Sequence, residues 1–157
     1  MFKAIFILLT LFMYAQASIA NDRLVAFQTD YCTGIPEGTP TNPTAWKNCC
    51  LMHDMLFWSG GDKNDRDEAD LGLRKCVADK GYPNLSWIIY EAVRLGSYSP
   101  IKFENKKWNF GWPDRPEHQK LTSQDIDQVE KEIFKPEYSY IPLHIKVAFI
   151  YDLRTRR

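Results

Sequence analysis

The chain has 157 residues, which is enough for one compact domain and short for two. Its 20 basic side chains balance its 20 acidic ones at neutral pH. Such a balance gives no basic surface of the kind that binds nucleic acid, so we expect no nucleic-acid partner.

The first 20 residues have the pattern of a secretory signal peptide. Lys3 supplies a short positive start, residues 4–14 form an apolar run, and Ser18-Ile19-Ala20 is a cleavage site of small residues. The apolar run is too short to span a bilayer as a helix. We therefore expect a single mature domain over residues 21–157, secreted or periplasmic.

All four cysteines lie in the expected mature domain, at positions Cys32, Cys49, Cys50 and Cys76. An even number of cysteines in an exported chain predicts disulfides. Adjacent cysteines rarely bond each other, so Cys32 and Cys76 would each pair with one member of Cys49-Cys50. A zinc site is the alternative, but zinc ligands usually come as spaced pairs rather than as adjacent cysteines.

Residues 48–54 concentrate more chemistry than a packed core requires, because His-Asp follows the two adjacent cysteines at short spacing. In a helix, His53 would lie one turn beyond both cysteines, on the stripe that carries Trp46 and Phe57. Asp54 would point about 100° further round. The alternative interpretation is a structural cysteine pair beside an incidental core histidine.

Caps, glycines and apolar periodicity predict four helices. The first covers Pro43 to about Trp58, with Asn42 as the cap and Gly60-Gly61 as the stop, and the second runs from its cap Asn64 to Gly81. The third covers Asn84 to Leu95, and the fourth begins at Thr122, where Asp125 would complete a capping box. The third should bury Leu85, Ile88, Ala92 and Leu95, and the fourth Ile126, Val129 and Ile133. The alternating residues 143–149 predict a strand.

The link over residues 59–63 is short, so the first two helices should be antiparallel neighbours. A disulfide from the first helix to Cys76 would clamp them. The sequence therefore predicts a mainly α fold, built on a disulfide-linked antiparallel helix pair with additional helices and irregular loops.

Asp70 falls on the inward face of the second helix, three residues before Leu73, where it would face His53. A carboxylate beside an imidazole fixes the tautomer and stabilises the imidazolium, which leaves the other ring nitrogen to take a proton. No serine or cysteine is placed as a nucleophile, so the base would activate water. Asp54 could bind a hard cation such as Ca²⁺ with carbonyls of the Cys32 loop, beside the base.

Three motifs carry a family resemblance. Cys49-Cys50-Leu51-Met52-His53-Asp54 has the form C-C-x-x-H-D, Asp70 stands six residues before Cys76, and Tyr31-Cys32 is followed by Gly38-x-Pro40. In these motifs the chain resembles the secreted phospholipase A2 superfamily, in particular its compact bacterial members, over about residues 31–76. The resemblance extends the predicted fold to a phospholipase A2-like core.

The resemblance implies a role for each of these residues. His53 would be the catalytic general base, Asp70 its orienting partner in the catalytic pair, and Asp54 the carboxylate ligand of Ca²⁺. The carbonyls of Tyr31, Thr33 and Ile35 would complete the metal site, with Glu37 as an alternative ligand. The implied disulfides are Cys32–Cys50 and Cys49–Cys76. The substrate would be a glycerophospholipid in a membrane surface or lipid aggregate, cleaved at the sn-2 ester.

The chain departs from the family pattern at two places. Residues 33–37 lack the glycine-rich centre of the calcium loop, and Phe57 replaces a tyrosine that would donate a hydrogen bond to Asp70. A second hypothesis is therefore a catalytically silent domain that binds lipid or a protein, and a third is a metal-free esterase. Trp108 and Trp112 would either pack within their loop or, beside Lys106-Lys107, form an aromatic patch at a membrane interface.

Overall fold

The computed structural model describes residues 23–98 and 107–156. The expected signal peptide lies outside the described residues. Within those ranges the chain is helical, without a named strand. The helices are α2 (Lys47–Ser59), α3 (Lys63–Asp79), α4 (Pro83–Tyr98), α5 (Ser123–Ile133) and α6 (Leu143–Thr155), with a short 3₁₀ helix η2 (Pro136–Tyr138). The prediction of a mainly α fold is confirmed.

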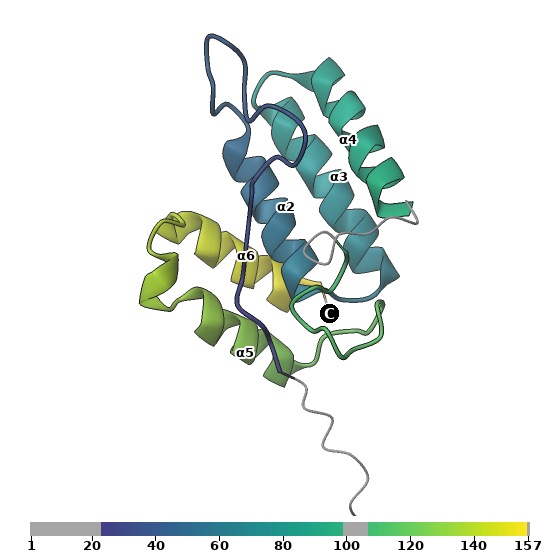
Figure 1. The fold of residues 1–157 in the computed structure, drawn as a ribbon, viewed down its shortest axis with the longest axis vertical. Helices are drawn as coiled ribbons and strands as arrows, with labels where there is room; N and C mark the ends of the chain where they lie inside the picture. The colour runs from purple at the N-terminus through teal and green to yellow at the C-terminus, as the bar shows by residue number, and fades with distance from the viewer. Residues whose placement is uncertain (1–22, 99–106, 157) are drawn as a thin grey trace, which may run out of the picture.

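Helix α2 lies in the middle of the molecule (Figure 1), in contact with α3 on one side and α6 on the other. Helix α4 packs on α3, and α5 packs on α6. The N-terminal segment is tied across the end of α2, because the Trp58 indole N–H donates to the Val25 carbonyl at 2.8 Å. Helix α2 therefore contacts both helix pairs of the fold, the pair α3–α4 through α3 and the pair α5–α6 through α6.

Helix α2 begins one turn later than the Asn42-Pro43 signal predicts. The Asn42 carbonyl accepts N–H groups from Thr39 and Ala45 in a tight turn, and the Trp46 N–H donates to the Glu37 carbonyl at 3.0 Å. These turn hydrogen bonds compete with the first helical turn, so Trp46 becomes the N-cap. The predicted stop is confirmed: Gly60, at a φ of 73°, is the C-cap.

Helix α3 begins at a different cap from the predicted Asn64. The Asp62 carboxylate accepts the N–H groups of Asn64 and Asp65, and the Asp65 carboxylate accepts the Asp62 N–H at 2.7 Å. This reciprocal capping box satisfies donors that Asn64 alone would have left open. The predicted antiparallel pairing of α2 and α3 is present.

Helix α4 forms where predicted but buries a different stripe from the predicted one. Ile88 is 66% exposed and Leu95 73% exposed, whereas Ser86 and Ile89 are buried. The buried stripe is a second apolar one, Leu85, Ile89 and Val93, which has the same helical spacing and packs with Leu73 and Val77 of α3. The predicted burial of Ile88, Ala92 and Leu95 is therefore wrong.

Helix α5 agrees with the sequence in its cap and its core face. Thr122 and Asp125 form the predicted capping box, and Ile126, Val129 and Ile133 are buried. The predicted strand over residues 143–149 is wrong, because this segment belongs to α6. The buried positions of α6 are Lys146, Phe149, Ile150 and Leu153, which follow the helical period of three and four.

The aromatic segment around Trp108 packs into the core and forms no surface patch. Trp108 and Trp112 are 2% and 1% exposed, and their indole N–H groups donate to the Gly61 and Ser59 carbonyls. Gly111 fits tightly, because an added Cβ would lie 2.4 Å from the Trp58 carbonyl oxygen. The prediction of an interfacial patch at these tryptophans is wrong.

None of the helices in residues 23–98 and 107–156 is long and apolar enough to cross a membrane.

The Tyr138 hydroxyl fastens the N-terminal segment to the α5–η2 corner. It accepts the Phe27 N–H at 3.0 Å and donates to the Glu132 carboxylate at 3.1 Å. Burial raises the pKa of Tyr138 to about 12, so the hydroxyl keeps its proton throughout the neutral range.

Replacing Tyr138 with Phe should lower the free energy of unfolding by about 1–3 kcal/mol, because the buried Phe27 N–H loses its acceptor. Urea unfolding of Tyr138→Phe measures the change. Tyr140→Phe is the matched control, because that ring is half exposed and should change stability by less than about 0.5 kcal/mol. Equal effects of the two variants would contradict the assignment.

A second prediction concerns the pH dependence of stability at the start of α5. Burial raises the pKa of Asp125, but hydrogen bonds from Arg115 and Thr122 outweigh it and hold the pKa below its usual value. A carboxyl with a lowered pKa in the folded state stabilises the protein above about pH 4 and loses that contribution as the pH falls further.

The variant Asp125→Asn should therefore be less stable than the parent at pH 7, by roughly 1–3 kcal/mol, and the difference should shrink in acid. Unfolding titrations between pH 7 and pH 3 measure both quantities. Asp127→Asn, on the exposed side of the same helix, serves as the control. A gap between Asp125→Asn and the parent that widens toward low pH would contradict the sign.

Candidate functional site

The predicted imidazole–carboxylate pair is present between α2 and α3. His53 Nε2 lies 2.8 Å from Asp70 Oδ1. The Asp70 side chain is fully buried, and His53 is 9% exposed. Phe57, one turn further along α2, covers the imidazole, with the two ring centroids 4.3 Å apart.

The hydrogen bond assigns the two nitrogens of His53 to different roles. An ionised carboxylate only accepts hydrogen bonds, so Nε2 carries the proton and donates it to Asp70. Nδ1 is then the ring nitrogen with a lone pair. None of the described residues hydrogen-bonds to Nδ1, which makes it the atom that could accept a proton from water.

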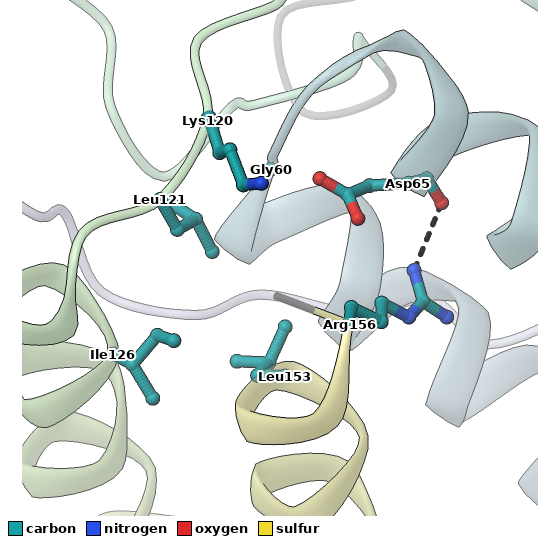
Figure 2. A pocket seen from close by; sticks show the side chains of 7 residues that line it. All are labelled: Gly60, Asp65, Lys120, Leu121, Ile126, Leu153 and Arg156. Atoms are coloured by element: carbon teal, nitrogen blue, oxygen red, sulfur yellow. Dashed lines mark hydrogen bonds between the residues drawn. The ribbon is translucent and has the colours of Figure 1, made fainter.

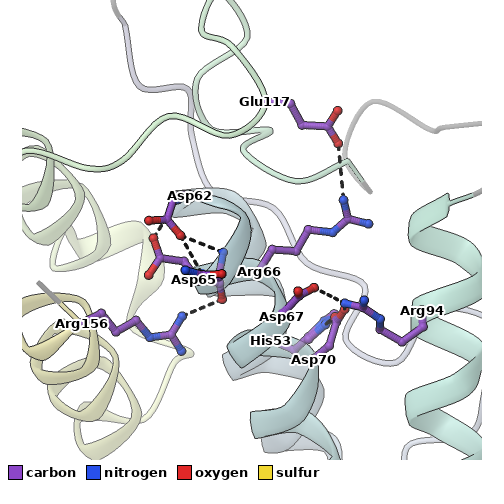
Figure 3. A network of polar contacts seen from close by, with 10 residues as sticks. His53, Asp62, Asp65, Arg66, Asp67, Asp70, Arg94, Glu117 and Arg156 are labelled. Carbon is purple, nitrogen blue, oxygen red and sulfur yellow. Dashed lines mark hydrogen bonds and ion pairs between the residues drawn. The ribbon is translucent and has the colours of Figure 1, made fainter.

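The second oxygen of Asp70 is held by an arginine that sequence reasoning did not single out. Arg94 Nη1 of α4 lies 3.1 Å from Asp70 Oδ2 and also pairs with Asp67, one turn earlier on α3 (Figure 3). Each Asp70 oxygen therefore has a donor from a different helix. The buried carboxylate is compensated from both sides.

The Cys49–Cys76 disulfide joins α2 and α3, and Cys32–Cys50 joins the preceding loop to α2. These are the pairings that the resemblance implies, and they leave no free cysteine in the described chain. Each member of the adjacent pair therefore fastens a different segment to α2, one of them the helix that carries Asp70.

Asp54 lies beside the start of the Cys32 loop and is held by a threonine. The Thr29 hydroxyl donates to Asp54 Oδ2 at 2.6 Å and accepts the Tyr31 N–H at 2.9 Å. Tyr31 adopts a left-handed backbone with φ of 60°, and the Lys47 ammonium stacks 3.9 Å from its ring centroid. Thr29 therefore connects the proposed metal carboxylate to the backbone of the loop.

The loop carbonyls divide into two sets. Those of Cys32, Pro36 and Glu37 accept hydrogen bonds from Ile35 and Trp46. Those of Tyr31, Thr33 and Ile35 accept none of the hydrogen bonds formed among the described residues. The alternative ligand Glu37 is drawn toward the start of α2, where its carboxylate lies 3.2 Å from the Lys47 ammonium.

The oxygen donors at Asp54 and in the Cys32 loop are of the type that binds a hard cation, but they include few carboxylates. Residues 23–98 and 107–156 hold no group of three or more His, Cys, Asp or Glu side chains suited to a metal. A Ca²⁺ ion would therefore depend on the Asp54 carboxylate and on backbone carbonyls of the loop. All of these are oxygen donors, the type that Ca²⁺ prefers.

A small cavity elsewhere in the fold does not belong to this pair. It lies between α3, α6 and the start of α5, where Asp65, Lys120, Leu153 and Arg156 line it (Figure 2). Its volume of about 20 Å³ has room for about one water molecule. Neither His53 nor Asp70 lines it, so it is not the place where a substrate would meet the imidazole.

No protein-family model matches this chain, and neither the curated proteins nor the solved structures contain a significant match. The fold and the site therefore define a small disulfide-linked helical protein with a buried histidine–aspartate pair.

Sequence reasoning identified His53, Asp54 and Asp70 but missed Thr29, Asp67 and Arg94. Thr29 precedes the loop without any motif, and Arg94 lies on a helix whose buried face was assigned to its apolar residues. The charged spacing of Asp67 and Asp70, one turn apart, is the sequence signal that could have suggested a basic partner.

The burial of the His53–Asp70 pair leads to a prediction about the free energy of unfolding. Replacing Asp70 with Asn removes the charge between His53 and Arg94, and should lower the free energy of unfolding by about 1–3 kcal/mol because a buried charge-assisted pair is lost. Asp67→Asn removes the other, more exposed partner of Arg94 and should cost less than about 1 kcal/mol. Chemical denaturation compares the two variants, and an equal or larger loss in Asp67→Asn would argue against Asp70 as the central carboxylate.

Proposed function

We propose that this protein is an exported phospholipase A2-like hydrolase that cleaves the sn-2 ester of glycerophospholipids. The single observation that carries the proposal is the buried hydrogen bond of 2.8 Å between His53 and Asp70. It leaves His53 Nδ1 as a base with a fixed tautomer and orientation. The C-C-x-x-H-D motif supplies the substrate class through the family resemblance.

The chemistry follows from a base without a protein nucleophile. His53 Nδ1 takes a proton from water while the water oxygen attacks the sn-2 carbonyl carbon. The bond from that carbon to the sn-2 ester oxygen then breaks, and the imidazolium returns the proton to the leaving alcohol. The products are a fatty acid and a lysophospholipid. Asp70 stabilises the imidazolium between the two proton transfers.

Ca²⁺ is the proposed cofactor, with Asp54 and the carbonyls of Tyr31, Thr33 and Ile35 as its ligands. When bound, Ca²⁺ supplies positive charge beside the ester carbonyl and stabilises the oxyanion that forms on attack. The Thr29 hydroxyl orients the Asp54 carboxylate by its 2.6 Å hydrogen bond and fixes the loop to α2. This contact supports the proposal that the Cys32 loop and Asp54 of α2 together hold the cation.

Two disulfides support an oxidising compartment, which agrees with a secreted or periplasmic protein. The proposed partner is the surface of a phospholipid membrane or of a lipid aggregate that presents the ester.

The direct test uses purified protein and a phosphatidylcholine with different acyl chains at sn-1 and sn-2. Mass spectrometry of the released acid should show the sn-2 chain only, with Ca²⁺ present and not with a chelator. His53→Gln should lower the rate by about 10²–10⁴-fold, because it removes the general base. His118→Gln, at an exposed histidine, should retain the parent rate.

Each other outcome of this assay would indicate a different function. Release that ignores the chelator but depends on His53 would indicate a metal-free esterase at the same pair. No release from any phospholipid with Ca²⁺ would contradict the proposed hydrolase activity. The remaining hypothesis would be a catalytically silent domain that binds lipid or a protein. Release that survives His53→Gln would place the chemistry elsewhere.

A further inference from the structure

We infer that Arg94 is a positioning residue of the proposed site, which holds the Asp70 carboxylate in the orientation that fixes His53. The geometry comes from three neighbouring helices. His53 of α2 occupies Asp70 Oδ1 at 2.8 Å, and Arg94 of α4 occupies Oδ2 at 3.1 Å. A carboxylate with one donor on each oxygen cannot rotate without losing one of them.

Burial makes this contact consequential. The Asp70 side chain is fully buried, so a lost partner could not be replaced by bulk water. The Arg94 side chain is 20% exposed, which limits solvent screening of the pair. Without Arg94, the Asp70 oxygen that faces α4 would carry an uncompensated buried charge. The carboxylate would lower that cost by turning away from His53 or by taking a proton.

Arg94 is itself held in place. Its guanidinium also pairs with Asp67, which lies one turn before Asp70 on the same face of α3 (Figure 3). One nitrogen of Arg94, Nη1, contacts both carboxylates. The side chain of lysine ends one atom shorter, so its ammonium would not reach the position that Nη1 occupies. Arg94 therefore joins α4 to the His53–Asp70 pair through the position of its guanidinium and not through charge alone.

The orientation of α4 explains why Arg94 reaches the dyad. Ser86 and Ile89 face α3 while Ile88 and Leu95 face solvent, and this rotation brings Arg94 to Asp70. Helix α4 thus contributes to the site without contributing a group that touches substrate.

The role of Arg94 in the reaction rests on the proposed function, so the test includes a measurement independent of activity. Arg94→Gln removes the charge, and Arg94→Lys keeps the charge on a side chain that is one atom shorter. Arg74→Gln is the matched control, because Arg74 also bridges α3 and α4, stacking 3.2 Å from the Trp87 ring centroid. Urea unfolding and near-ultraviolet circular dichroism establish that each variant is folded.

Kinetics on monomeric short-chain phosphatidylcholine separate positioning from binding. Arg94→Gln should lower kcat by about 10–100-fold with little change in KM, because a displaced dyad loses rate while the substrate still binds. Arg94→Lys should retain more of kcat than Arg94→Gln, and Arg74→Gln should match the parent. An unchanged kcat in Arg94→Gln, or a rise in KM alone, would overturn the positioning role.

Nitrogen-15 NMR of the imidazole gives the independent measurement. His53→Gln identifies the His53 signals among those of the three histidines. In the parent and in Arg74→Gln, the neutral ring should show the proton on Nε2, and in Arg94→Gln the two tautomers should mix. If the parent hydrolyses no phospholipid, the proposed function fails while the tautomer still decides the role of Arg94. A fixed Nε2–H tautomer in Arg94→Gln would refute it.

If Arg94→Gln does not fold, the decision passes to Arg94→Lys. A lysine at this position should give a kcat below that of the parent and a partly mixed tautomer, because its shorter side chain leaves the ammonium short of the position from which Nη1 contacts both carboxylates. Parent values of both quantities would reject the inference.

Discussion

The fold is organised around one fully buried carboxylate. Asp70 lies on α3 without contact to solvent, and a buried charge is tolerated only where partners compensate it. Those partners are His53 on α2 and Arg94 on α4, one on each side. The relative position of three helices is thus linked to one side chain, and the Cys49–Cys76 disulfide limits how far α2 and α3 can move apart.

A second connection ties the far end of α2 to segments distant in sequence. The Asn109 and Gly111 N–H groups donate to the Phe57 and Trp58 carbonyls, and Gly111 accepts from Val25. The last carbonyls of α2 are thereby satisfied by the aromatic segment rather than by water. At the middle of the helix, the Thr29 hydroxyl donates to the Asp54 carboxylate and ties the N-terminal segment to α2. Helix α2 is fixed along its length, which gives the imidazole a rigid support.

The parts of the fold that the sequence could predict are those with local signals. The Gly60 stop and the Thr122–Asp125 capping box involve residues within one turn of each other, and both were predictable. The start of α2 was not, because a hydrogen bond from Trp46 back to Glu37 moved the cap. Such a contact between a loop and a helix end leaves no mark in local propensity.

The candidate site likewise has residues that the sequence could predict and residues that it could not. His53 and Asp70 were predictable as a pair, because helical spacing beside cysteines places both on inward faces. Arg94 was not, because its direction depends on which face of α4 meets α3. Two apolar stripes of α4 competed for that contact, and the stripe of Ile89 packs on α3 instead of the predicted stripe of Ile88 and Leu95. The tryptophans at 108 and 112 misled for a related reason: composition suggested an interface, whereas their indole N–H groups found carbonyls in the core.

The measurement that tests the central claim most directly is a high-resolution crystal structure of the protein grown in Ca²⁺. We expect a cation bound by an Asp54 oxygen and by loop carbonyls, next to His53 Nδ1, with Asp70 buried between His53 and Arg94. A structure with no cation at Asp54 and with the Asp70 carboxylate turned away from the imidazole would contradict the proposed hydrolytic site.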